Sequence, residues 1–154
     1  TGKSPDDIPI MVQVTIETTG TMLLGTEISA ATTALAGFPI LSLGLNCATG
    51  PVEMSQHVHY LAQYWSKLIS VVPNAGLPAL VDGHAHFPLA PQPFADALID
   101  FVHKQGVNIV GGCCGTTPEH IRAISQAVDG IKPRVISSDI QPSTSSSSGS
   151  ALSN

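Results

Sequence analysis

The sequence predicts an α/β protein made of four consecutive strand–helix units. Two observations support this fold class. Four short apolar runs rich in β-branched residues recur along the chain, and each is followed by a segment with the start signals and apolar spacing of a helix. Repeated units of this kind form a parallel sheet with right-handed crossovers. Two architectures satisfy the pattern: an open doubly wound sheet, or part of a closed eight-stranded barrel, which in full takes ~250 residues.

The four apolar runs are expected to be buried strands. They lack the clean apolar–polar alternation of half-exposed strands, which favours burial on both faces of the sheet. The expected strands cover 8–15, 40–46, 68–72 and 107–110.

Helix start signals follow each of these runs. Thr26 can cap the first helix, Pro51 stands in the first turn of the second, and Pro93 opens the third. The fourth helix begins at Thr116 or Thr117, and Thr116 and Glu119 have the spacing of a capping box. The expected helices cover 27–36, 51–67, 94–105 and 116–128.

The composition indicates one globular domain and excludes several kinds of partner. Of the 154 residues, 43% are hydrophobic, which is enough for a core, and the net charge is −5 without any cluster of Lys or Arg. A surface for nucleic acid or for an anionic membrane is therefore not expected. No apolar run approaches the ~20 residues of a membrane span. The Ser-rich composition of 136–154 predicts a flexible linker or tail.

The polar residues best suited to catalysis or metal binding follow the ends of the predicted strands. They are Glu17, Cys47, Asn74 and the adjacent pair Cys113 and Cys114. In open sheets and in barrels alike, active sites form at the carboxyl ends of the strands. Three cysteines, two of them adjacent, make a poor disulfide framework, so a reducing cytoplasm is the expected setting.

Three thiolates from two strand ends suit a zinc ion. They bind Zn²⁺ at ~2.3 Å and leave the fourth tetrahedral position open, as in catalytic zinc sites. The flanking Gly111, Gly112 and Gly115 allow backbone angles that turn both adjacent thiols toward one point. Two alternatives stay open: the cysteines are small apolar core residues, or they are redox-active vicinal thiols.

Three segments resemble motifs of the homocysteine S-methyltransferase family. GGCCGTTPEHI at 111–121 is similar to the last zinc motif of that family, GLNC at 44–47 to its earlier zinc motif, and PNAG at 73–76 to the segment between them. The stretch VTIETTGTMLLGTEI at 14–28 is most similar to the cobalamin-dependent branch of the family. The resemblance covers residues 8–135.

The resemblance implies a (β/α)₈ TIM barrel in which Cys47, Cys113 and Cys114 hold zinc. It implies methyl transfer to the thiol of homocysteine to form methionine. In the cobalamin branch the donor is methylcobalamin on other domains, and methyltetrahydrofolate on a folate domain recharges it. S-methylmethionine and betaine are the alternative donors, since the enzymes that use them share this zinc chemistry. The Asp-Gly motif on the family's first strand has no match here, so the chain is expected to be the C-terminal half barrel. A complementary N-terminal half, or a second copy of this chain, is the expected partner. The alternative functions are a zinc-binding half barrel without turnover and a thiol redox protein.

Two of the remaining polar residues, Asn74 and Glu17, each have two interpretations. Asn74 is interpreted either as a substrate contact or as part of a Pro-Asn-Ala-Gly turn. Glu17 is interpreted either as a contact for the substrate ammonium group or as the start of a loop. Two histidines are placed in a loop and two on helix surfaces, in the order His84, His86, His103 and His120.

Overall fold

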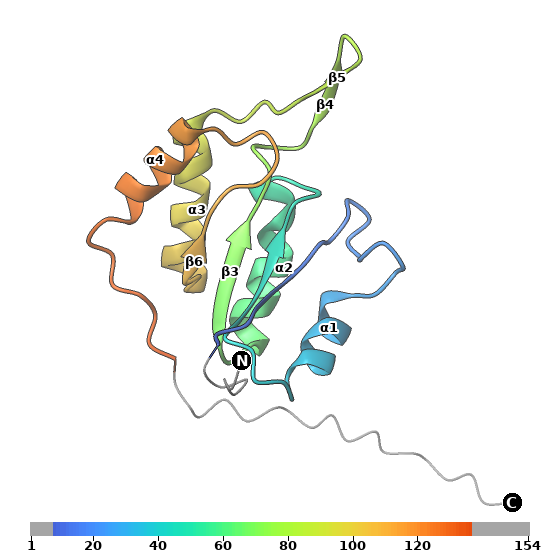
Figure 1. Ribbon diagram of the computed structural model, residues 1–154, viewed down its shortest axis with the longest axis vertical. Coiled ribbons are helices and arrows are strands. Elements are labelled where there is room, and N and C mark those ends of the chain that lie inside the picture. The colour runs from blue at the N-terminus through green and yellow to red at the C-terminus, as the bar shows by residue number, and fades with distance from the viewer. Residues whose placement is uncertain (1–7, 137–154) are drawn as a thin grey trace, which may run out of the picture.

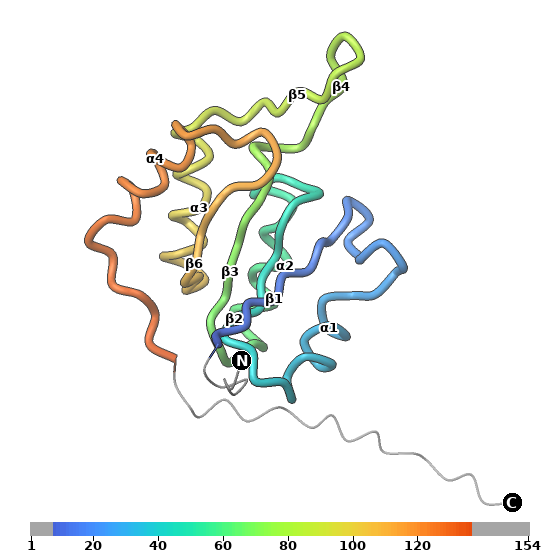
Figure 2. Tube along the Cα trace, viewed as in Figure 1, coloured from blue at the N-terminus to red at the C-terminus, as the bar shows by residue number. Residues whose placement is uncertain are grey.

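The computed structural model describes residues 8–136, which form a four-stranded parallel sheet covered by four helices (Figure 1). The strands stand in the order β1–β2–β3–β6, so each crossover returns to the next position in the sheet, as Figure 2 shows along the chain trace. The strands are β1 (Met11–Val14), β2 (Ser42–Asn46), β3 (Leu68–Val72) and β6 (Ile109–Val110). The helices are α1 (Ile28–Leu35), α2 (Pro51–Tyr64), α3 (Pro91–Gln105) and α4 (Pro118–Val128).

The predicted α/β class and the order of its four strand–helix units are confirmed. The sheet has no reversal of strand order, and each helix packs against the next one along the chain. A doubly wound sheet would reverse its strand order at a switch point. The sequential strand order is therefore consistent with a partial barrel-like fold.

The core lies between the sheet and the helices. Leu43 and Leu45 of β2 stand beside Ile69 and Val71 of β3, and these four side chains are fully buried. The helices contribute the other large buried side chains of the same cluster, which include Val58, Leu61, Phe94 and Leu98. Because side chains alternate along a strand, the residues between these positions face the opposite side of the sheet.

One row of residues on that opposite side crosses three strands. Gln13, Gly44 and Ser70 are register partners in β1, β2 and β3. The Gln13 side-chain amide donates to Ser70 Oγ over 3.3 Å, and it passes over Gly44 to do so. A Cβ at Gly44 would overlap the backbone and hydroxyl oxygens of Ser70. The row therefore needs glycine at its centre.

Several predicted boundaries are wrong by a few residues. Thr26 does not cap α1, because the N-cap is Glu27 and no side chain bonds there. The second helix ends at Tyr64 instead of residue 67, because Trp65 turns into an extended conformation, is buried, and donates its indole N–H to Leu68 O. The third helix begins at Pro91, before Pro93. The first and last strands are shorter than expected, since each lies at an edge of the sheet described here.

The loop predicted around His84 and His86 is instead a β-hairpin. β4 (Ala79–Val81) pairs antiparallel with β5 (His84–His86) through a turn at Asp82-Gly83. Both turn residues have positive φ, at 49° and 78°, which matches a two-residue type I′ turn. The hairpin projects from the body of the protein, and all six strand residues are exposed (Figures 1 and 2).

Two expectations concern segments beyond the core. Apart from Ile136, the Ser-rich segment predicted at 136–154 lies outside the described residues. Within residues 8–136, no helix has both the length and the apolar character needed to cross a bilayer.

Candidate metal centre

The three cysteines meet above the carboxyl end of β3. Cys47 follows β2, and Cys113 and Cys114 follow β6, so they come from the two strands that flank β3. The sulfur of Cys114 lies 3.6 Å from that of Cys47 and 3.9 Å from that of Cys113. All three sulfurs lie within 4.8 Å of one another. The predicted convergence of the thiols at one sheet edge is therefore present.

The end of β3 anchors both cysteine segments. The Cys47 N–H donates to Val72 O over 3.1 Å, and the Cys113 N–H donates to Pro73 O over 2.8 Å. These bonds continue the ladders of the sheet for one step on either side of β3. The backbone of each cysteine segment is therefore fixed by the same short stretch of chain.

A left-handed backbone turns Cys47 out of its strand. Cys47 has φ of 56° and Ala48 has φ of 55°, although neither is glycine. The left-handed region costs about 1–2 kcal/mol for each residue with a Cβ. Strain of this kind is kept where the surrounding structure imposes it, and such positions cluster at functional sites.

The turn at Cys113 and Cys114 depends on the glycine that follows them. Gly115 has φ of +77°, and a Cβ there would overlap the ring of Phe87, which lies against it. Thr116 then donates both its N–H and its hydroxyl to Cys113 O, over 3.2 and 2.7 Å. The expectation that a flanking glycine turns this pair is thus met at Gly115, where φ is positive.

Asn74 joins the two cysteine segments from below. Its side-chain oxygen accepts the Cys114 N–H over 3.1 Å, and its own N–H donates to Thr49 O over 3.0 Å. The residue is buried, with 3% of its surface exposed. Asn74 therefore holds the site in shape, and its predicted contact with substrate stays a prediction.

Glu17 begins a turn near the site. Its carbonyl accepts the Gly20 N–H, and its N–H donates to Thr21 O. Its carboxylate is close enough to Cys47 to act against ionisation of that thiol. Glu17 therefore starts a loop, as one of its two interpretations predicts. The contact of Glu17 with a substrate ammonium group stays a prediction.

The thiols differ in their tendency to ionise. A hydrogen bond from the Ala48 N–H is the main cause that lowers the pKa of Cys47, and burial opposes it. Burial, together with hydrogen bonds to Cys47 and Cys114, raises the pKa of Cys113 to about 11. In the metal-free site, Cys47 is therefore the better nucleophile of these two.

Metal-free protein should accordingly be alkylated at Cys47 before Cys113. The thiolate is the reacting form, and a pKa of about 11 leaves roughly one Cys113 in a thousand ionised at pH 8. We expect iodoacetamide to label Cys47 at least ~10-fold faster at pH 8, with the ratio shrinking as pH rises toward 11. Fragmentation mass spectrometry of timed digests measures both rates. Equal rates at pH 8 would contradict the difference in pKa.

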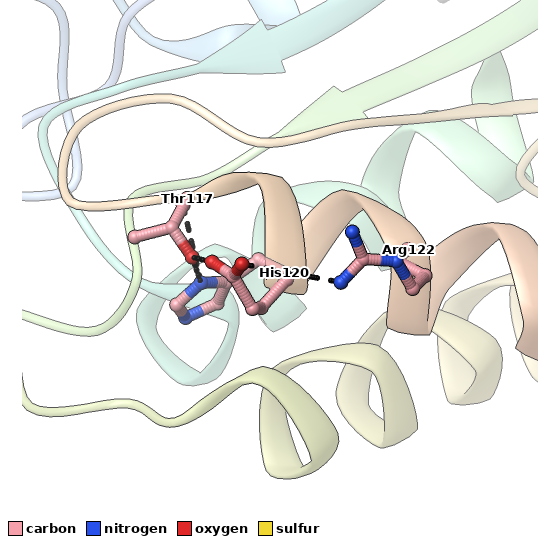
Figure 3. Close-up of polar contacts among 4 residues, drawn as sticks. Thr117, His120 and Arg122 are labelled. Carbon is pink, nitrogen blue, oxygen red and sulfur yellow. Dashed lines mark hydrogen bonds and ion pairs between the residues drawn. The ribbon is translucent and has the colours of Figure 1, made fainter.

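The histidine of the last motif is misplaced by the sequence prediction. His120 is buried, with 5% of its surface exposed, and it does not lie on the surface of α4. Of the two predicted start residues, Thr116 and Thr117, the capping residue is Thr117. Its N–H donates to His120 Nδ1 over 3.1 Å and its hydroxyl donates to Glu119 over 2.7 Å (Figure 3). A signal was present, because His120 stands four residues before the apolar Ile124 and so shares its buried helix face.

The chemistry of the donors defines the class of site. Three thiols form the single group of at least three metal-binding side chains gathered in residues 8–136. Tetrahedral zinc bonded to sulfur at ~2.3 Å separates its ligands by ~3.8 Å, close to the two short separations found here. Three thiols gathered at the carboxyl edge of a parallel sheet could therefore hold a metal ion such as zinc.

Comparison with known proteins gives the family. The family model described as "Homocysteine S-methyltransferase" matches residues 2–128, and the chain belongs to that family. The chain is 50% identical over 139 residues to methionine synthase from Mycobacterium tuberculosis, and 52% identical over 131 residues to that of Mycobacterium leprae. These alignments cover 90% and 82% of this chain but 12% and 11% of the relatives, so the chain spans about one eighth of their length.

Solved structures agree with the fold. The homocysteine methyltransferase MmuM from Escherichia coli in its metallated form superposes with a TM-score of 0.59 at 25% identity, covering 77% of this chain and 35% of that one. Its apo form superposes with a TM-score of 0.54 at 25% identity, covering 72% of this chain and 36% of that one.

Proposed function

We propose that this chain supplies the zinc-binding half of a barrel that transfers a methyl group to the thiol of homocysteine. The observation that carries the proposal is the gathering of three thiols within 4.8 Å at the carboxyl edge of the sheet. Membership of the homocysteine S-methyltransferase family and the similarity to methionine synthases support the choice of acceptor.

The roles of the residues follow from their positions. Cys47, Cys113 and Cys114 would hold Zn²⁺, which when bound keeps a thiol in its fourth position as the reactive thiolate. Asn74 fixes the backbone of Cys114 and leaves its amide nitrogen for the substrate. Glu17, beside Cys47, is suited to the ammonium group of an amino-acid thiol. A reducing cytoplasm keeps the three thiols available for the metal.

The strand order supports a half barrel over residues 8–135. Four parallel strands in sequential order, with each helix packed on the next, are half of the eight units that close a barrel. β1 and β6 each have one edge without a partner strand in the described sheet, and such edges pair readily with another chain or segment. The proposed partner is an N-terminal half barrel or a second copy of the chain. A methylcobalamin donor on further domains fits the much greater length of the methionine synthases.

X-ray absorption at the zinc edge tests the proposal without a methyl donor. Protein purified without oxygen should hold about one zinc with three sulfur neighbours, and L-homocysteine should add a fourth sulfur. Methionine, whose sulfur already carries a methyl group, should not. Coordination unchanged by homocysteine would overturn the acceptor role.

A thiol redox function is the second candidate because of one distance. Cys47 Sγ and Cys114 Sγ lie 3.6 Å apart, so a small movement would allow a disulfide bond of ~2.05 Å. The zinc content of the reduced protein separates the two functions. A reduced protein that takes up no zinc but forms this disulfide reversibly would favour the redox function.

A further inference from the structure

We propose that His120 is a positioning residue for the three-cysteine centre, acting through two segments that hold the Cys113–Cys114 turn. His120 lies at the third position of α4, and its ring packs edge-on against Phe94 with centroids 5.4 Å apart. The inference rests on the proposed function, since it concerns the shape of the proposed zinc site.

The two ring nitrogens of His120 bond to different parts of the chain. Nδ1 lies 3.1 Å from the Thr117 N–H and accepts from it, as Figure 3 shows. Nε2 lies 2.9 Å from Leu89 O. A backbone N–H only donates and a carbonyl only accepts, so the proton of the ring stands on Nε2. The neutral Nε2–H form is the one that satisfies both contacts.

The segment on the Leu89 side leads directly to Cys114. The Leu89 N–H donates to Ala75 O over 3.0 Å, and the Ala75 N–H donates to Cys114 O over 2.9 Å. Two residues before Leu89, the ring of Phe87 lies against Gly115. Through its bond to Leu89, His120 therefore fixes the segment 87–89, which lies against the Cys113–Cys114 turn at Gly115.

The segment on the Thr117 side leads to Cys113. Thr116, next to Thr117, donates twice to Cys113 O. His120 thus links the segment that binds the Cys113 carbonyl to Leu89, which is bonded to Ala75, the residue that binds the Cys114 carbonyl. A capping box has Glu or Gln at this helix position, and a carboxylate could accept from Thr117 but could not donate to Leu89. Histidine does both.

The direct test is Co²⁺ binding to the full chain, prepared without oxygen and without zinc. His120→Glu keeps the helix cap and removes the donor to Leu89. Because His120 reaches Cys114 only through Leu89 and Ala75, we expect Co²⁺ affinity to fall ~10-fold, the lower end of the effect of losing a direct partner of a ligand. The ligand-field spectrum should shift as well. His120→Gln, which has both an acceptor and a donor, should recover most of the affinity. His59→Glu, an exposed histidine on α2, is the control and should bind Co²⁺ as the wild type does.

A second measurement needs no metal. Hydrogen exchange of the Ala75 and Leu89 amides should speed up ~10-fold in His120→Glu and much less in His120→Gln. Wild-type protein that binds no Co²⁺ would refute the proposed zinc function, while faster exchange at these amides would still support the coupling. The role of His120 would be overturned if both amides exchanged in His120→Glu at the wild-type rate. It would also be overturned if this substitution left the Co²⁺ affinity and spectrum unchanged.

Discussion

Replacing Cys114 with serine should abolish zinc binding. Losing an outer-shell partner alone lowers metal affinity ~10–100-fold, so losing one of three thiolate ligands should lower it at least ~100-fold. A serine hydroxyl does not ionise near neutral pH and is a poor ligand for zinc. Cys114 is the central residue of the set, because its sulfur is the one within 3.9 Å of both others. Elemental analysis should fall from about one zinc per chain to under ~0.1.

Two controls show whether the loss is specific to the site. Cys114→His keeps a nitrogen ligand that zinc accepts beside two cysteines, so it should retain part of the zinc. Because bound metal stabilises the folded state, EDTA should lower the melting temperature of the wild type but leave that of Cys114→Ser unchanged. A Cys114→Ser protein that keeps a full zinc would show that the metal binds elsewhere.

Replacing Gly44 with alanine should destabilise the fold by about 2–4 kcal/mol. The added Cβ would overlap the backbone oxygen and the hydroxyl of Ser70, and overpacking costs about 1–3 kcal/mol. The hydrogen bond from Gln13 to Ser70, which passes over Gly44, would be lost for about 1 kcal/mol more. Urea unfolding followed by circular dichroism gives the change in free energy of unfolding.

Gly37→Ala is the matched control, since no atom lies within 4 Å of a Cβ built there and its φ is not positive. It should change stability by less than ~0.5 kcal/mol. The double variant with Ser70→Gly should recover only part of the loss, because the backbone oxygen of residue 70 still stands in the way. A Gly44→Ala protein as stable as Gly37→Ala would contradict the close approach of β2 and β3.

The order of strands and helices and the meeting of the thiols could be predicted because both depend on local patterns. A buried strand appears as a short apolar run, and Pro51 marks the first turn of its helix. Once the strands are parallel, their carboxyl ends lie at one edge, so Cys47, Cys113 and Cys114 are expected at that edge. Asp82-Gly83 is a strong signal for a hairpin turn, which would have allowed the hairpin to be predicted. The three-residue strands beside it are too short to show apolar–polar alternation.

The class of fold, the order of its elements and the sheet edge that carries the cysteines follow from sequence patterns. The left-handed backbone at Cys47, the row through Gly44 and the burial of His120 emerge with the folded sheet. The difference lies in the range of the interactions. Periodicity and capping act within a few residues, whereas these three features depend on partners at Val72, Ser70 and Leu89, which are distant in sequence and reach their places only when the sheet forms.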